Sequence, residues 1–233
     1  MNYLISNQCR TIGKTIIKPD KEFSFLSYLI TGSKNILIDT LPERSAALLL
    51  EEVEHAIGEK QLDAIIMNHS EEDHSGALPA VLAAHSHTPI YCSEKCRERL
   101  LAILPEADYH VVKTGDNIQI GEQYFRFQET PGLHWDDNIV TFWENHRTLF
   151  SNDLFGQYAA AEPPIDRDYP LDRLIEAAED YYKAVFSKAS YQEKSVINDI
   201  KKLPIQIIAP GHGLILKYSM SDMLRLYQER LKE

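Results

Sequence analysis

Two histidines and two carboxylates that can bind a metal lie within six consecutive positions of the chain. They are His69, Glu71, Asp73 and His74, in the segment IIMNHSEEDHSGALPA. These residues follow the apolar run Leu62–Met67, interrupted only by Asp63, which predicts a strand buried on both faces. Open α/β sheets place their ligand sites at the carboxyl ends of strands. One metal ion cannot easily use four groups from so short a loop, so the sequence indicates two adjacent metal ions.

The spacing within this segment predicts how the side chains are directed. In an extended chain, every second side chain points to the same side, so His69, Glu71 and Asp73 are expected to converge. His74 is then expected to begin the following helix. Glu72 is expected to point away from the ligands.

Three further candidate ligands, His134, Asp153 and His212, follow other predicted strands. His134 lies in TPGLHWDD, Asp153 in LFSNDLFGQ and His212 in IIAPGHG. Each follows an apolar run and is surrounded by Gly, Pro, Asn or Ser, which are typical of turns. The repeated context indicates that all three contribute to the same site. The other histidines are expected at the surface: His55, His85, His87, His110 and His146.

The elements that must position these residues alternate between strands and helices at both ends of the chain, with a β-rich middle. A hairpin is predicted over residues 23–40, and burial of two sheet faces under helices predicts an α/β layered sandwich. No linker, repeat or low-complexity segment interrupts the chain, so residues 1–233 are expected to form one domain. Strands are predicted at 62–67, 89–92, 110–113, 117–120, 124–128, 138–143, 148–151 and 205–209, and helices at 42–57, 76–85, 94–104, 171–187, 191–203 and 220–231.

Composition excludes several classes of function. The chain has 233 residues, 44% of them apolar, and a net charge of -11. The acidic balance argues against binding to nucleic acids and to anionic membranes, which require a Lys/Arg face. No apolar run approaches the roughly 18 residues of a membrane span, and no signal peptide is visible. The three cysteines, Cys9, Cys92 and Cys96, are too sparse for a disulfide framework, so the cytoplasm is the expected location.

The ligand pattern resembles that of the metallo-β-lactamase superfamily, and within it the diiron domain of the flavodiiron proteins. The superfamily motif has histidine at its second position, whereas this chain has Glu71, as the flavodiiron version does. The resemblance extends from SYLITGSKNILIDT through HWDDN and LFSNDLFGQ to IIAPGHG. It implies a four-layer αββα sandwich of the metallo-β-lactamase type.

The resemblance also implies two iron ions, cycling between Fe2+ and Fe3+, joined by a bridging carboxylate. The donor chemistry agrees, because a carboxylate in place of an imidazole hardens the site and suits iron or manganese. Zinc, by contrast, has no accessible redox step. The implied ligands are His69, Glu71 and His134 for one iron, Asp73, His74 and His212 for the other, and Asp153 between them.

Other residues match or depart from the flavodiiron pattern. Tyr181 and Tyr182 fall where the family keeps a pocket tyrosine that can hydrogen-bond oxygen, so they are the candidate catalytic residues, with packing in the core as the alternative for each. Trp135 resembles an aromatic residue that could wall the pocket. Asp136 stands where proline is usual, and Tyr158 where histidine is usual. These two departures are expected to alter the polarity of the pocket or the face at which electrons enter.

Flavodiiron proteins continue into a flavodoxin domain that holds FMN, whereas no phosphate-cradling loop for FMN is visible here and no flavodoxin domain is expected. The favoured function is therefore O2 binding for oxygen sensing or signalling, with a signalling protein as partner. The alternative is an O2 or NO reductase that receives electrons from a separate flavin or rubredoxin protein. A dinuclear zinc hydrolase is a second alternative, against which Glu71 argues. The resemblance implies a homodimer, although the flavin that motivates head-to-tail pairing in the family is not expected in this chain.

Overall fold

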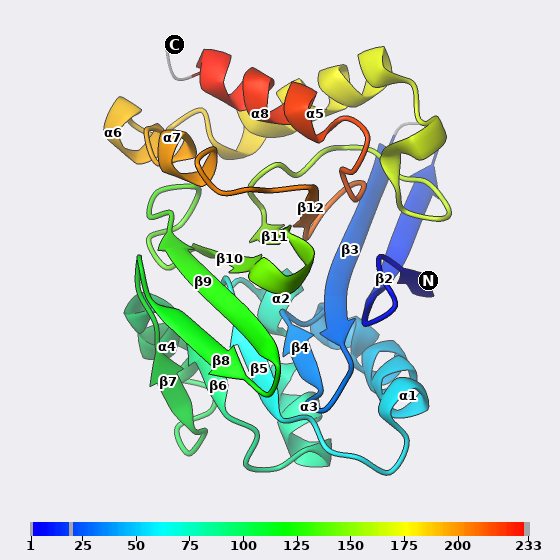
Figure 1. The fold of residues 1–233 in the computed structure, drawn as a ribbon, viewed down its shortest axis with the longest axis vertical. Helices are drawn as coiled ribbons and strands as arrows, with labels where there is room; N and C mark the ends of the chain where they lie inside the picture. Colours follow the sequence, from blue (N-terminus) through cyan, green and yellow to red (C-terminus); the bar gives the residue numbers. More distant parts are fainter. Residues whose placement is uncertain (1, 19–20, 231–233) are drawn as a thin grey trace.

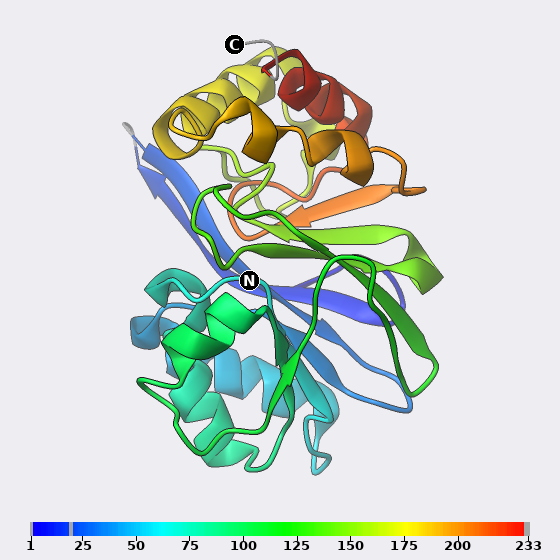
Figure 2. The ribbon, with the colours of Figure 1, turned by 90° about the vertical axis from the view of Figure 1, so that its left-hand side faces the viewer.

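The computed structural model describes residues 2–18 and 21–230, which form two β-sheets packed face to face with helices on both outer faces (Figure 1). Figure 2 shows the four layers in the order helices, sheet, sheet and helices. The predicted αββα sandwich is confirmed. Within the described ranges, none of the helices combines the length and apolar character needed to cross a lipid bilayer.

The first sheet has seven strands, in chain order from one edge to the other. Its first four strands pair antiparallel, and its last four pair parallel. The parallel part directs several strand ends to one edge, where the ligand-rich segment begins. The strands are β1 (Asn2–Leu4), β2 (Cys9–Lys18), β3 (Lys21–Ile30), β4 (Ile36–Ile38), β5 (Ala64–Met67), β6 (Ile90–Cys92) and β7 (Tyr109–Val111).

The second sheet has five strands in the order β12-β11-β10-β9-β8. Its pairs are antiparallel except for β11 and β12, which run parallel. Because β11 and β12 run in the same direction, their carboxyl ends lie side by side. The strands are β8 (Asn117–Ile120), β9 (Gln123–Glu129), β10 (Ile139–Trp143), β11 (Thr148–Asn152) and β12 (Ile207–Pro210).

Three buried apolar clusters hold the four layers together. One joins helix α1 and its neighbours to the first sheet, one fills the space between the sheets, and one joins the second sheet to α5 and α8. Burial of this apolar surface is the main favourable contribution to folding. The helices on the first sheet are α1 (Ala46–Ile57), α3 (Leu78–Ala84) and α4 (Glu94–Leu100); those on the second are α5 (Leu171–Val185), α6 (Tyr191–Lys194), α7 (Ile197–Ile200) and α8 (Met220–Glu229). Single turns are α2 (Glu72–Ser75), η1 (Glu43–Ser45), η2 (Glu144–His146) and η3 (Asp166–Asp168).

Several elements differ from the sequence prediction. Strands β1 and β2 were not predicted, because Gly13 and Lys14 interrupt the apolar pattern of β2. The helix predicted over 191–203 is divided into α6 and α7, and between them the Ser195 hydroxyl donates to the carbonyl of Gln192 at 2.6 Å. Such local side-chain bonds compete with continued helix. The last helix ends at Glu229, and residue 231, the end of the predicted helix, lies outside the described residues.

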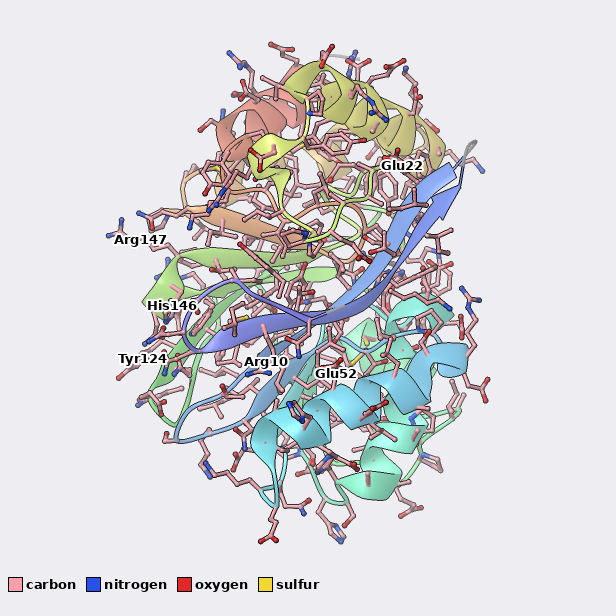
Figure 3. All side chains as sticks on the ribbon, turned by 90° about the vertical axis from the view of Figure 1, so that its right-hand side faces the viewer. Arg10, Glu22, Glu52, Tyr124, His146 and Arg147 are labelled. Atoms are coloured by element: carbon pink, nitrogen blue, oxygen red, sulfur yellow. The ribbon has the colours of Figure 1, made fainter. Side chains whose placement is uncertain are left out.

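The β2–β3 hairpin connects the two halves of the sandwich, as Figure 3 shows from the side. Near its upper end, Glu22 accepts hydrogen bonds from the hydroxyl of Tyr169 at 2.8 Å and from Arg173 at 3.2 Å. Further along β3, the amide of Leu26 donates to the carbonyl of Gly211 at 2.9 Å. Strand β3 is therefore held against the segment that carries His212.

Candidate metal centre

All seven candidate ligands lie together where the carboxyl ends of β5, β11 and β12 meet the loop between β9 and β10. Their donor atoms form two groups, and within each group all of them lie within 4.8 Å of one another. Two groups of this size match two adjacent cation positions. The first group contains His69, Glu71, His134 and Asp153, and the second contains Asp73, His74 and His212.

Asp153 lies between the two groups and presents one oxygen to each. Its Oδ2 lies 3.3 Å from Nε2 of His134 and 3.6 Å from Nε2 of His69. Its Oδ1 lies 3.1 Å from Nε2 of His212 and 3.2 Å from Nε2 of His74. A carboxylate shared in this way has the geometry of a ligand that bridges two cations.

The segment after β5 is not extended throughout. The predicted reason why the side chains of His69, Glu71 and Asp73 converge, an extended backbone, was therefore wrong. Glu71 has extended backbone angles (φ -61°, ψ 149°), but α2 begins at the next residue. Asp73 and His74 therefore lie within a helical turn, and His74 does not begin the helix. This turn directs Glu71 to one group and the other two side chains to the second group. Glu72 points away, as predicted, and accepts a hydrogen bond from the amide of Glu43 at 2.9 Å.

Two of the histidines are oriented by partners that the sequence did not reveal. Nδ1 of His69 lies 3.0 Å from Oδ1 of the fully buried Asp137. Nδ1 of His212 donates to the carbonyl of Ser24 at 2.8 Å. Such partners fix the tautomer and leave Nε2 free for a metal. Asp137 had one sequence signal, its place beside Asp136 in HWDD, whereas a backbone carbonyl has none.

A further buried carboxylate, Asp39, ties together the residues that precede two of the ligands. Its Oδ1 accepts from the amide of Asn68 at 2.7 Å, and its Oδ2 accepts from Nδ2 of Asn68 at 2.9 Å and Nδ2 of Asn152 at 3.2 Å. Asn68 immediately precedes His69, and Asn152 immediately precedes Asp153. Asp39 follows β4 and is 4% exposed, so one buried group fixes ligands from both sheets.

Two oxygens of the cluster indicate that a cation fits the site. Oδ1 of Asp73 and Oδ2 of Asp153 are buried and have no hydrogen-bond partner in the described part of the chain. Buried polar atoms are normally hydrogen-bonded, and buried charges are paired or coordinate metals. Since both oxygens face imidazole Nε2 atoms of the cluster, metal ions between them would satisfy both.

The carboxylates and imidazoles of the cluster hold one another in their charged forms. Hydrogen bonds from His134 and His69 lower the pKa of Glu71 to about 2. Burial alone would lower the pKa of His134, but the nearby carboxylates of Asp153 and Glu71 outweigh it and raise this pKa to about 9. Burial also acts to lower the pKa values of His69 and His212. Their carboxylate partners outweigh this effect, and both pKa values rise to about 10. Without a metal, the carboxylates of the cluster therefore favour the positively charged form of these three imidazoles.

Metal uptake is accordingly expected to release protons. A ligating imidazole must be neutral, so a metal entering near pH 7 must displace the protons on His69, His134 and His212, about three per chain. Because their pKa values lie near 9 and 10, the apparent metal affinity should rise as pH increases from 6 to 9. Calorimetric titration of metal-free protein with Zn(II) or Fe(II), in buffers of different ionisation enthalpy, measures this release. Uptake without proton release would contradict the assignment of these histidines.

The structure brings Tyr181 to the cluster and directs Tyr182 away from it. The Tyr181 hydroxyl donates to Oδ1 of Asp153 at 3.0 Å. Burial and the nearby Asp153 charge raise the pKa of Tyr181 well above its usual value, so the hydroxyl remains a donor. Tyr182 packs its ring against that of Tyr227, with centroids 5.2 Å apart, and lies beneath the ammonium group of Lys194. Consecutive residues of a helix point about 100° apart, which explains the difference.

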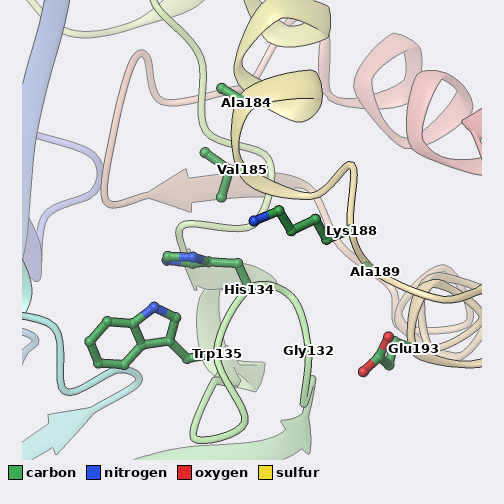
Figure 4. A pocket seen from close by; sticks show the side chains of 8 residues that line it. All are labelled: Gly132, His134, Trp135, Ala184, Val185, Lys188, Ala189 and Glu193. Atoms are coloured by element: carbon green, nitrogen blue, oxygen red, sulfur yellow. The ribbon is translucent and has the colours of Figure 1, made fainter.

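A cleft of about 470 Å³ opens beside the first group of donors (Figure 4). Trp135 forms part of its wall. The Trp135 ring lies 5.0 Å from the ring of His69, and the residue is 37% exposed. In Figure 4 the Lys188 side chain extends across the cleft above His134. A small molecule can therefore reach the His134 side of the cluster from solvent. The lining residues are Gly132, His134, Trp135, Ala184, Val185, Lys188, Ala189 and Glu193.

The remaining histidines lie outside the cluster. His55, His87 and His110 are exposed, as predicted. The surface prediction was wrong for His85, which is buried at the end of α3 with Nδ1 3.2 Å from Oε1 of Gln61. His146 is half-buried because its ring stacks on Trp143, with centroids 4.1 Å apart. All three cysteines are free and buried.

Comparisons with known proteins agree with this geometry. The sequence model of a family described as ODP family beta lactamase matches residues 23–213. The chain is 34% identical to the anaerobic nitric oxide reductase flavorubredoxin of Vibrio vulnificus over 218 residues, covering 91% of this chain and 44% of the relative. It is 33% identical to the flavorubredoxin of Citrobacter koseri, covering 97% of this chain and 50% of the relative. The chain thus spans about half the length of the curated relatives it matches.

Two solved structures are similar over the whole chain. Rubredoxin oxygen:oxidoreductase from Desulfovibrio gigas matches with a TM-score of 0.90 and 25% identity, over 100% of this chain and 62% of that one. A mutant of the flavo di-iron protein from Thermotoga maritima matches with a TM-score of 0.91 and 27% identity, over 100% and 61% of the two chains. The same two-sheet sandwich is therefore present in these structures.

Proposed function

Because the chain belongs to the ODP family of beta lactamases, we propose that it is a diiron protein that reduces O2 or NO with electrons from a separate carrier protein. The observation that carries this proposal is the position of Asp153, with one oxygen facing each group of donors. The names of two similar proteins, a nitric oxide reductase and an oxygen oxidoreductase, support the choice of substrates. The name rubredoxin oxygen:oxidoreductase supports a rubredoxin as the electron donor, with a flavin protein as the alternative.

The donor set supports iron as the metal. Three carboxylates and four imidazoles form a harder site than the imidazole-rich sites of hydrolytic zinc enzymes. Bound in the two positions, Fe(II) ions would supply electrons to O2 or NO. The carboxylate of Glu71, where the hydrolases keep an imidazole, is the feature that argues most directly against a dinuclear zinc hydrolase.

The protein's own residues hold the two positions in a fixed relation. Asp153 sets the separation of the two groups, and the Tyr181 hydroxyl holds one of its oxygens. Asp137 and the Ser24 carbonyl hold two of the imidazole rings, so little reorganisation is required when a substrate enters. His134 and Trp135 line a cleft that gives access to one side of the cluster.

Oxygen sensing, the function favoured by the sequence alone, differs from reduction in one measurable respect. A sensor binds O2 once and keeps the altered state, whereas a reductase continues to consume O2 or NO while electrons are supplied. The names of the similar proteins favour the reductase. Signalling and homodimer formation remain predictions.

The experiment that tests the proposal begins with anaerobic purification and measurement of metal content. Fe(II)-loaded protein is then mixed with O2 or NO in the presence of reduced rubredoxin or reduced flavodoxin, and gas consumption is followed. Two irons per chain with continued consumption would support the proposal. Two irons with a single stoichiometric uptake, and a visible absorbance change that persists, would support the sensor instead. Two zinc ions and chelator-sensitive hydrolysis of a thioester would support the hydrolase.

Replacing Tyr181 with phenylalanine should slow gas reduction about tenfold while both irons remain bound. The substitution removes a hydrogen bond to the charged Asp153, a contact typically worth about 1.5–3 kcal/mol. Tyr182→Phe is the matched control, because its ring packs among Tyr227 and Phe186 away from the cluster. Gas consumption per iron is the measurement. Equal rates in the two variants would show that the Tyr181 hydroxyl has no part in the reaction.

A further inference from the structure

Arg99, on helix α4, contacts three consecutive residues of the loop that carries a candidate ligand. Its guanidinium carbon lies 4.8 Å from the ring centroid of Trp135. Its Nη2 donates to Oδ1 of Asp136 at 2.6 Å, and its Nη1 donates to Oδ1 of Asp137 at 3.2 Å. These three residues directly follow His134. One side chain of α4 therefore fixes this part of the loop.

The contact with Asp137 continues to the cluster. Oδ1 of Asp137, the atom that accepts from Arg99, also lies 3.0 Å from Nδ1 of His69. The other oxygen accepts from the amide of Ser70 at 2.8 Å, and the Asp137 carbonyl accepts from the hydroxyl of Ser93 at 2.7 Å. Asp137 is fully buried, whereas the side chain of Arg99 is 39% exposed. A continuous line of charged contacts thus runs from the surface to His69.

We propose that Arg99 is a positioning residue that sets the reduction potential of the metal pair through Asp137 and His69, an inference that rests on the proposed diiron function. A guanidinium on Asp137 withdraws electron density from this carboxylate. The carboxylate then attracts the Nδ1 proton of His69 less strongly, so His69 donates less density to its metal. The positive charge also disfavours Fe(III) relative to Fe(II) directly. Both effects raise the potential.

Asp136 provides an opposing influence on the same guanidinium. Its side chain is 56% exposed, and it shares Arg99 with the buried Asp137. Neutralising Asp136 should leave the charge of Arg99 more available to Asp137. Substitutions of the two partners are therefore expected to shift the potential in opposite directions, which a general loosening of the loop would not do.

The test is a redox titration of the iron-loaded full chain, followed by visible absorbance and electron paramagnetic resonance. Arg99→Met should shift the midpoint potential to more negative values, and Arg99→Lys, which retains the charge, should restore much of the difference. Asp136→Asn should shift it to more positive values. Arg97→Met is the matched control, because Arg97 lies on the same helix and pairs with the exposed Glu94. The midpoint potential of the Arg97→Met variant should equal that of the unaltered protein.

Each result decides the inference. An unchanged potential in Arg99→Met with two irons bound would overturn it, as would shifts of the same sign in Arg99→Met and Asp136→Asn. Where Arg99→Met fails to fold or to hold iron, Asp136→Asn decides: a positive shift supports the inference, and no shift overturns it. If the unaltered protein itself does not bind two irons, the proposed function fails and this inference fails with it.

Discussion

Replacing Asp153 with alanine is expected to reduce the iron content from two ions per chain to one or none. Asp153 faces both groups of donors, with its oxygens 3.1–3.6 Å from four imidazole nitrogens. Its loss removes a ligand from each cation and leaves the two cations to repel each other without a shared negative charge. Outer-shell substitutions already cost about 10–100-fold in metal affinity, so the loss of a direct ligand should exceed that range. Metal analysis after anaerobic loading gives the result.

Thermal unfolding provides a second measurement on the same variant. Free metal at about a thousand times its Kd stabilises a folded protein by about 4 kcal/mol. For a domain of this size, that corresponds to a rise in Tm of about 8–16 °C. The unaltered protein should show this rise on adding Fe(II), and Asp153→Ala should show little of it.

Asp166→Ala is the control that separates loss of metal from loss of fold. Asp166 is also buried, but it accepts hydrogen bonds from the amides of Lys217, Tyr218 and Ser219, away from the cluster. Its removal should lower the free energy of unfolding while both irons still bind. Retention of two irons by Asp153→Ala would refute the bridging assignment.

Replacing Glu71 with histidine is expected to shift the metal preference from iron towards zinc. Oε2 of Glu71 lies 3.1 Å from Nε2 of His134 and 3.3 Å from Nε2 of His69, so it shares one cation position with two imidazoles. A third imidazole would soften this position and remove a negative charge, and imidazole-rich sites suit zinc. Protein loaded from an equimolar mixture of Fe(II) and Zn(II), without oxygen, should show the change by metal analysis.

Glu72→His is the matched control for this substitution. Glu72 is the adjacent residue, but its carboxylate accepts from the amide of Glu43 and lies outside both groups of donors. Its replacement should leave the ratio of iron to zinc unchanged. If Glu71→His still takes up iron alone, the explanation based on ligand hardness is incorrect.

The candidate ligands could be found from the sequence because their positions follow from local patterns. A continuous apolar run such as Ala64–Met67 predicts a buried strand, and polar residues at the end of such a strand fall at the site edge. The same reasoning locates Asp153 and His212 after β11 and β12. The local sequence pattern was sufficient for these residues because each of them directly follows a strand that ends at the site.

Other features depend on contacts between distant segments and were not predictable in the same way. The choice between Tyr181 and Tyr182 depends on the rotation of α5 against the second sheet, since both are aromatic and both are buried. The carbonyl of Ser24 orients His212 across 188 positions of sequence. Arg99 has no local pattern that relates it to HWDD, because only the packing of α4 brings the two together.

The distribution of the donors along the chain also determines when the centre can be completed during protein synthesis. His69, Glu71, Asp73 and His74 are translated well before His134, Asp153 and His212. Each group of donors needs residues from both parts, and the bridge lies in the later one. A nascent chain on the ribosome therefore cannot complete the first group before Asp153 has been made, or the second group before His212 has been made. Both positions can therefore be complete only after the chain has been synthesised as far as His212.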